Sequence, residues 1–148
     1  MPEVLIDLGP VRELSYIRDQ RGHIAIGALT RHHDLEHSGV LARSVPLLAH
    51  AAGQVGDPQV RHRGTIGGSL AHSDPASDLP ATILALDATL VARGPSGIRE
   101  MAARPVQFRK PQIVGVAATL SEQTRVLGPH HPRTQDAHPA SIISVRSR

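Results

Sequence analysis

Residues 63–79 read Arg63-Gly64-Thr65-Ile66-Gly67-Gly68-Ser69-Leu70-Ala71-His72-Ser73-Asp74-Pro75-Ala76-Ser77-Asp78-Leu79. A glycine pair allows positive φ and leaves no side chain between its N–H groups and a ligand. Successive N–H groups in such a turn favour phosphate oxygens. We therefore expect residues 61–78 to form a long loop, with the Thr65 and Ser69 hydroxyls adding hydrogen bonds and Asp78 facing sugar hydroxyls. The alternative is a plain Gly-Gly turn in which Asp78 only caps the next helix.

Upstream of this stretch the pattern predicts strands and then short helices. Val4–Leu8 and His23–Ala28 are β-rich runs bounded by glycine or Gly-Pro turns. Thr30 is a candidate N-cap for a helix over Arg31–His37. Pro46–Ala52 follows as a second helix, because proline suits a first helical turn.

Downstream, the best amphipathic signal is a helix that begins near Asp78. Leu79, Ile83 and Leu86 lie at i, i+4 and i+7 and should be buried. A strand over Thr89–Ala92 follows, and residues 112–120 could form one more. The expected fold class is α+β, with a small mixed or antiparallel sheet flanked by short helices.

Composition excludes several classes of function. Tyr16 and Phe108 are the only aromatic residues, which argues against base stacking and hence against nucleic-acid partners. The chain has no cysteine, so disulfides, thiolate zinc sites and iron–sulfur ligation are ruled out. No apolar run approaches the ~20 residues of a membrane span, and Met1 is not followed by signal-peptide features. We expect a cytoplasmic chain.

Charge divides the chain into two parts. Residues 1–98 hold 8 basic and 10 acidic residues, whereas residues 99–148 hold 8 and 3. The excess positive charge of the last third could serve anionic partners, although its Arg-, Pro- and His-rich composition is typical of an unpacked tail. We assign residues 1–98 to one partial domain and leave 99–148 unassigned, as a disordered or frame-shifted basic tail.

A series of stretches in the same order over residues 3–93 matches a known family, and this is a more specific signal than the glycine pair alone. They include Gly56-Asp57-Pro58-Gln59-Val60-Arg61, Gly64-Thr65-Ile66-Gly67-Gly68, Asp74-Pro75-Ala76-Ser77-Asp78-Leu79-Pro80 and Ala85-Leu86-Asp87-Ala88. These stretches resemble the FAD-binding (medium) subunit of molybdenum hydroxylases, in the carbon monoxide dehydrogenase and xanthine dehydrogenase family.

The resemblance implies a fold, a cofactor and partners. The fold would be that of the middle FAD-binding subdomain. FAD would take electrons from the iron–sulfur small subunit and pass them to an acceptor, beside a molybdopterin-binding large subunit. Flavin supplies the redox chemistry, so no catalytic residue is named. The cofactor-binding residues carried over by the resemblance are Val55, Thr65, Ile66, Gly67, Gly68, Ser69 and Asp78, with Ser69 where the family usually has Asn.

Two departures from the family lead to an expectation of truncation at both ends. The family's Ala-Gly-Gly-x-Ser loop precedes the strand that here follows Met1, and residues from about Arg99 lose the resemblance. We therefore expect weak FAD affinity and little activity from this chain alone. The alternative is a non-enzymatic remnant that binds no flavin.

Two of the histidines are candidate metal ligands. His33 and His37 lie at i, i+4 of a predicted helix and could bind zinc. The sequence indicates no acidic third ligand beside them, so we expect solvated histidines and no metal site.

Overall fold

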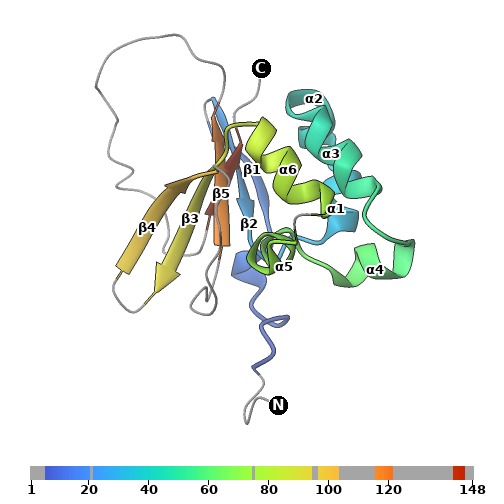
Figure 1. The fold of residues 1–148 in the computed structure, drawn as a ribbon, viewed down its shortest axis with the longest axis horizontal. Helices are drawn as coiled ribbons and strands as arrows, with labels where there is room; N and C mark the ends of the chain where they lie inside the picture. The colour runs from blue at the N-terminus through green and yellow to red at the C-terminus, as the bar shows by residue number, and fades with distance from the viewer. Residues whose placement is uncertain are drawn as a thin grey trace.

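The fold is a six-stranded sheet with its helices gathered on one side (Figure 1). The computed structural model describes residues 6–20, 22–74, 76–94, 97–103, 116–121 and 142–145. The expected α+β class with a small sheet and short helices is confirmed.

The sheet combines two hairpins with two strands between them. Its strands are β1 (Ile17–Gln20), β2 (His23–Gly27), β3 (Thr89–Gly94), β4 (Gly97–Ala102), β5 (Val116–Ser121) and β6 (Ile142–Val145). The strand order is β1-β2-β5-β6-β3-β4. Within the described strands, only the β5–β6 pair is parallel and the other pairs are antiparallel, so the sheet is mixed. The two hairpins, β1–β2 and β3–β4, therefore form its edges.

In the part of the chain that the structure describes, six short helices follow β2, and local chemistry fixes where several of them begin. They are α1 (His32–Glu36), α2 (Gly39–Ser44), α3 (Pro46–Gly53), α4 (Pro58–Arg63), α5 (Ile66–His72) and α6 (Asp78–Ala85), after a 3-10 turn at Arg12–Leu14. Ser38 caps α2 and Asp57 caps α4, each side-chain oxygen accepting an N–H three residues on. Pro46 and Pro58 occupy first turns, where a missing N–H costs nothing.

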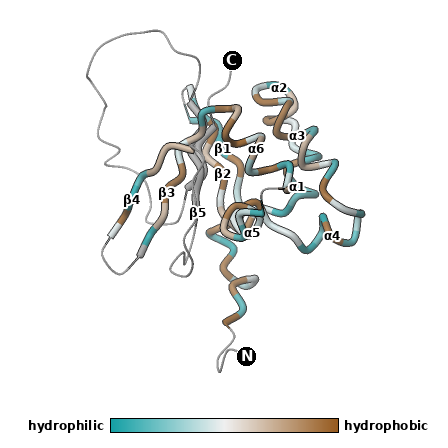
Figure 2. The backbone as a smooth tube through the Cα atoms, in the orientation of Figure 1, coloured by the Kyte–Doolittle hydropathy of each residue, from teal (hydrophilic) through white to brown (hydrophobic). Residues whose placement is uncertain are grey.

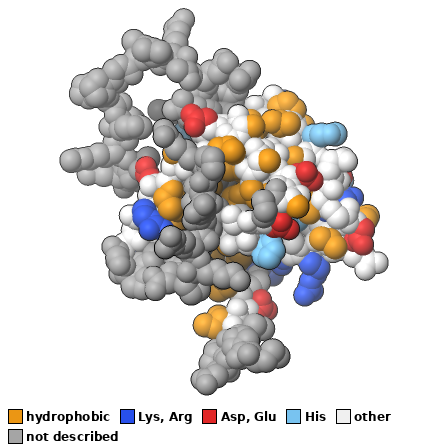
Figure 3. All heavy atoms as spheres, in the orientation of Figure 1, with side chains coloured by type: hydrophobic (Ala, Val, Ile, Leu, Met, Phe, Trp, Pro, Cys, Tyr) orange, Lys and Arg blue, Asp and Glu red, His pale blue; other side chains and the backbone are white. Residues whose placement is uncertain are grey.

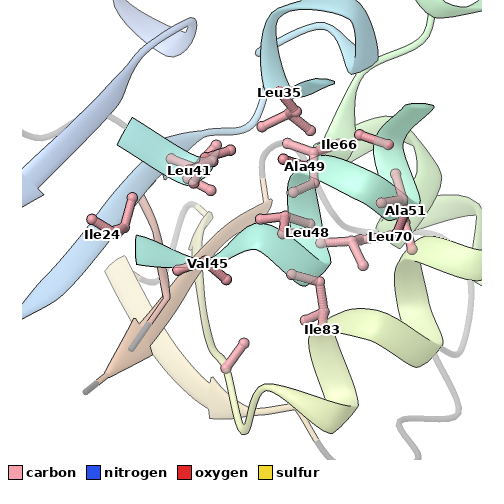
Figure 4. Close-up of a cluster of buried hydrophobic side chains, with 14 of the residues drawn as sticks. Ile24, Leu35, Leu41, Val45, Leu48, Ala49, Ala51, Ile66, Leu70 and Ile83 are labelled. Carbon is pink, nitrogen blue, oxygen red and sulfur yellow. The ribbon is translucent and has the colours of Figure 1, made fainter. Parts of the chain in front are cut away.

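The core lies where helices and sheet meet. Ile24 on β2, Leu48 on α3 and Ile83 on α6 converge there with side chains from α1, α2 and α5 (Figure 4). Figure 2 shows hydrophobic stretches along α3 and α6, whereas most of α4 is hydrophilic. The prediction for α6 is confirmed for Leu79 and Ile83, and Leu86 is partly buried against the same cluster.

Three local predictions are wrong. Residues 6–8 of the expected first strand have no regular structure, and residues 4 and 5 lie outside the described part. Thr30 does not cap α1, because its hydroxyl accepts the N–H of Tyr16 and donates to the Tyr16 carbonyl. The expected loop over residues 61–78 is mostly helical, since it contains the end of α4, all of α5 and the start of α6.

The sheet takes strands from both sides of residue 98. β4 spans that position, and the backbone of β6 pairs with β2 and β3. The division at 98 stays a prediction. The expectation of an unpacked tail depends on side chains such as those of Val126, Ile142 and Ile143, which lie outside the described residues. No helix in the described ranges is long and apolar enough to cross a membrane.

Candidate functional site

The Thr65–Asp78 stretch begins with a capped helix. Thr65 is the N-cap of α5, and its Oγ1 accepts the N–H of Gly68 at 3.1 Å. The N–H of Ser69 donates to the Thr65 carbonyl at 3.0 Å. Both glycines therefore lie in the first turn of a helix, because Thr65 supplies the side-chain acceptor that this end needs.

The segment after β2 holds this helix start in place. The N–H of Ile66 donates to the Thr30 carbonyl at 3.0 Å, and the N–H of Gly67 donates to the Ala28 carbonyl at 2.8 Å. On the other side, the N–H of His32 donates to the Gly64 carbonyl at 3.1 Å. The start of α5 is thus tied to the backbone that leaves β2, and the first N–H groups of the helix are already occupied.

Gly67 and Gly68 differ in what a side chain at each position would meet. A Cβ at Gly67 would lie 2.6 Å from the Ala28 carbonyl oxygen and 2.7 Å from the Ala28 Cβ. Gly67 is therefore needed for the close approach of α5 to the chain after β2. A Cβ at Gly68 would meet only the Thr65 Oγ1, at 3.0 Å, and Gly68 is exposed. Gly68 is the glycine that leaves an open surface.

Ser69 is linked by its hydroxyl to Ser77, the residue before Asp78. The hydroxyls of Ser69 and Ser77 lie 3.2 Å apart, which joins α5 to the residue before α6. Asp78 is the first residue of α6 and is exposed. Ser77 is the N-cap of α6, so the prediction that Asp78 caps it is wrong. Among the described residues the Asp78 carboxylate has no hydrogen-bond partner, so it is available to a ligand.

The remaining predicted residues are packed into the protein. Ile66 is fully buried in the core cluster. Val55 lies in the connection from α3 to α4 and is partly buried against the same core. These two side chains pack into the core and offer no polar group to a ligand, unlike Thr65, Ser69 and Asp78.

The expected role of the glycine N–H groups needs correction. The Gly67 N–H is bonded to Ala28 and the Gly68 N–H to Thr65, so neither is free for phosphate oxygens. The Thr65 hydroxyl accepts from Gly68 and can still donate its own proton, since a hydroxyl is both donor and acceptor. The Ser69–Ser77 pair likewise keeps one hydroxyl proton for another acceptor. Hydroxyl groups, rather than backbone N–H groups, are the donors here.

A buried histidine packs under the site. His32 is 4% exposed, and a Cβ at Gly64 would meet its ring atoms at 2.7 Å. Burial, followed by the charge of Arg31, lowers the pKa of His32 below its ordinary 6.5. Its Nδ1 is buried without a hydrogen-bond partner in the described structure. The lowered pKa favours the neutral form of His32, and its ring requires the glycine before Thr65.

Sequence reasoning missed Ser77 as the partner of Ser69. The signal was the serine immediately before Asp78, which is an ordinary N-cap residue.

Charged side chains are scattered on the face shown in Figure 3, and no large patch of one sign appears there among the described residues.

Comparisons with known proteins give the class of this α+β unit. Residues 1–118 match the family described as the FAD binding domain in molybdopterin dehydrogenase. The carbon monoxide dehydrogenase medium chain of Hydrogenophaga pseudoflava is 41% identical over 126 residues, which are 85% of this chain and 42% of that protein. The glyceraldehyde dehydrogenase medium chain of Sulfolobus acidocaldarius is 41% identical over 102 residues, 69% of this chain and 36% of that one.

A solved structure shows the same fold. The carbon monoxide dehydrogenase of Hydrogenophaga pseudoflava has a TM-score of 0.67 and 35% identity, covering 92% of this chain and 41% of the matched chain. The chain therefore belongs to the FAD-binding domain family of molybdopterin dehydrogenases. It spans about two fifths of the length of these relatives, and the cofactor of the family is FAD.

Proposed function

We propose that this chain is the FAD-binding part of an electron-transfer subunit in a molybdenum hydroxylase of the carbon monoxide dehydrogenase type. An iron–sulfur small subunit and a molybdopterin-binding large subunit would be its partners, and the cytoplasm its compartment. The match over residues 1–118 supports this proposal, as do relatives named as medium chains of dehydrogenases. FAD, when bound, supplies the redox chemistry, and the protein supplies position and hydrogen bonds.

The residues present fit a phosphate- and hydroxyl-rich ligand. Gly68 is exposed and leaves room for close approach beside Thr65. The Thr65 and Ser69 hydroxyls can donate to phosphate oxygens, and the unpartnered Asp78 carboxylate can accept from ribose or ribityl hydroxyls. Hydrogen bonds to a charged group contribute about 1.5–3 kcal/mol each. Two such hydroxyls would therefore decide much of the affinity.

The other carried-over residues act indirectly in this proposal. Ile66 anchors the start of α5 in the core, and Gly67 lets α5 approach Ala28. Val55 packs against the core before α4, which leads into Gly64 and Thr65. Together they hold the hydroxyl groups in place.

The experiment is a titration of the purified chain with FAD, followed by flavin fluorescence. Asp78→Asn keeps the shape of the side chain but removes its charge and half of its acceptor capacity. It should weaken FAD binding by about tenfold, equivalent to roughly 1.4 kcal/mol. Asp87→Asn is the matched control, because Asp87 is also an exposed carboxylate but follows the other end of α6. Equal affinities of both variants, or no binding of FAD by the parent chain, would contradict the proposal.

A further inference from the structure

A cluster of imidazole and carboxylate groups lies on α1, apart from the candidate flavin site. His33, Glu36 and His37 each offer a ligand atom, and these atoms all lie within 4.8 Å of one another. The spacing has a simple cause, because residues at i, i+3 and i+4 share one face of a helix. The His37 N–H donates to the His33 carbonyl at 3.1 Å, so the helical geometry extends to His37.

A fourth group comes from α4. The His62 ring stacks on the His33 ring, with centroids 4.1 Å apart and an angle of 23° between the planes. The His37 ring also contacts the His33 ring, with centroids 4.2 Å apart and an angle of 42° between the planes. Three imidazoles and one carboxylate from two helices are thus brought together, although His62 is 25 residues or more from the others in the sequence.

Backbone carbonyls set the orientation of two of the rings. The Nδ1 of His37 lies 2.9 Å from the His33 carbonyl oxygen, and the Nδ1 of His62 lies 2.6 Å from the Pro58 carbonyl oxygen. A carbonyl only accepts, so Nδ1 is the donor in each ring, and Nε2 is the nitrogen left for a metal ion. Metal-binding histidines are commonly held in this way, with the second ring nitrogen donating to a backbone carbonyl.

The carboxylate is held as well. Glu36 Oε2 accepts from Arg61 Nε at 3.0 Å, and the Arg61 guanidinium also donates to the Gly56 carbonyl at 3.1 Å. A carboxylate offers about four lone-pair positions, so Glu36 can bind a cation while it remains bonded to Arg61. Carboxylates that ligate metals are typically hydrogen-bonded on their outer side.

We propose that His33, His37 and Glu36, completed by His62, form a binding site for a divalent transition-metal ion of the zinc class. Nitrogen and carboxylate donors suit zinc, whereas magnesium and calcium prefer all-oxygen sites. Ligand atoms about 2.0–2.1 Å from a tetrahedral zinc ion lie roughly 3.3 Å from one another. Rotation of the side chains would close the difference, since His37 is exposed and His33 and Glu36 are only partly buried.

Such an ion would join α1 to α4. The segment that follows α4 is Gly64-Thr65, which α1 already holds through the His32–Gly64 hydrogen bond. The site is a structural one by its position, and it does not depend on the proposed flavin function. The expectation of solvated histidines overlooked Glu36, which the i, i+3 spacing places beside His33. It also lacked one observation that only the folded chain provides, the arrival of His62.

The test uses the full chain after removal of metal by a chelator. Zn²⁺ is titrated with a chromophoric competitor, and Co²⁺ is added separately to record the visible bands of a tetrahedral site. One ion per chain is expected. His37→Ala should weaken Zn²⁺ binding by at least about tenfold, because loss of even an outer hydrogen-bond partner costs about 10–100-fold. His62→Ala should weaken it and change the Co²⁺ bands.

The matched control is His50→Ala, an exposed histidine on α3 outside the cluster. It should leave zinc affinity unchanged. Because His37 is exposed, its replacement should preserve the fold, which far-ultraviolet circular dichroism verifies. Equal Zn²⁺ affinity of the His37 and His50 variants would overturn the proposal, as would the absence of binding by the parent chain at about 100 μM Zn²⁺.

Discussion

Replacement of Gly67 by alanine should destabilise the protein, although alanine is the better helix former. The added Cβ would lie 2.6 Å from the Ala28 carbonyl oxygen, whereas ordinary contact begins at 3.4 Å. The start of α5 must therefore move away from the chain after β2 by several tenths of an ångström. That movement stretches the 2.8 Å hydrogen bond between the Gly67 N–H and Ala28.

The magnitude follows from three opposing effects. Overpacking of a close contact costs about 1–3 kcal/mol. A buried N–H that loses its acceptor costs about 1–3 kcal/mol more. Alanine returns about 1 kcal/mol through its higher helix propensity. The free energy of unfolding should therefore fall by about 1–5 kcal/mol, as measured by the urea midpoint at unchanged m-value.

Gly68→Ala is the matched control in the same helical turn. Its Cβ would meet only the Thr65 Oγ1, at 3.0 Å, and would otherwise face solvent. The small shift of the cap offsets the gain in propensity, so stability should change by less than about 1 kcal/mol. If ligand binding uses this open surface, Gly68→Ala should lower FAD affinity while the fold is intact. Equal urea midpoints for the two variants would refute the close approach of α5 to Ala28.

Three further predictions concern the core, the cap and the buried histidine. Ile83→Ala should lower the free energy of unfolding by about 2–5 kcal/mol. Leu84→Ala, at a position that is 41% exposed, should lower it by less than about 1 kcal/mol. Equal losses of melting temperature in the two variants would show that α6 is oriented differently. Thr65→Ala should cost about 1 kcal/mol and Thr65→Ser much less, and urea unfolding that ranks the two equally would argue against the cap. The pKa of His32 is lowered in the folded protein. As the pH falls below about 6.5, His32 therefore gains a proton in the unfolded chain before it does so in the folded one. The free energy of unfolding should then decrease by at most about 1.4 kcal/mol per pH unit. His32→Leu should flatten that part of the urea-midpoint profile between pH 7.5 and 5.5, and an unchanged profile would show that His32 is not the group responsible.

Local sequence chemistry determined most of the helical elements. Pro46 begins α3 as predicted, and Ser38 caps α2 through the N–H three residues on. The stripe of α6 is buried at Leu79 and Ile83, because apolar residues at i and i+4 share one helix face. These predictions succeeded because each depends on a few adjacent residues.

Thr30 shows where local chemistry is insufficient. Its position before a helix is typical of an N-cap, but its hydroxyl is bonded to the backbone of Tyr16. The competing partner is 14 residues away in the sequence, so only the pairing of distant segments could reveal it. The same reason explains why β4 was not predicted, since it pairs with β3 along its whole length.

The sequence by itself determined the α+β class and the family resemblance, and it predicted the residues of the candidate site. The tertiary structure decided what those residues do. Gly67 and Gly68 are indistinguishable in the sequence, yet one lies against Ala28 and the other faces solvent. His62 likewise joins the α1 histidines only because α4 packs beside α1. In both cases the deciding contact joins segments far apart in the chain, and no local pattern of residues encodes such a contact.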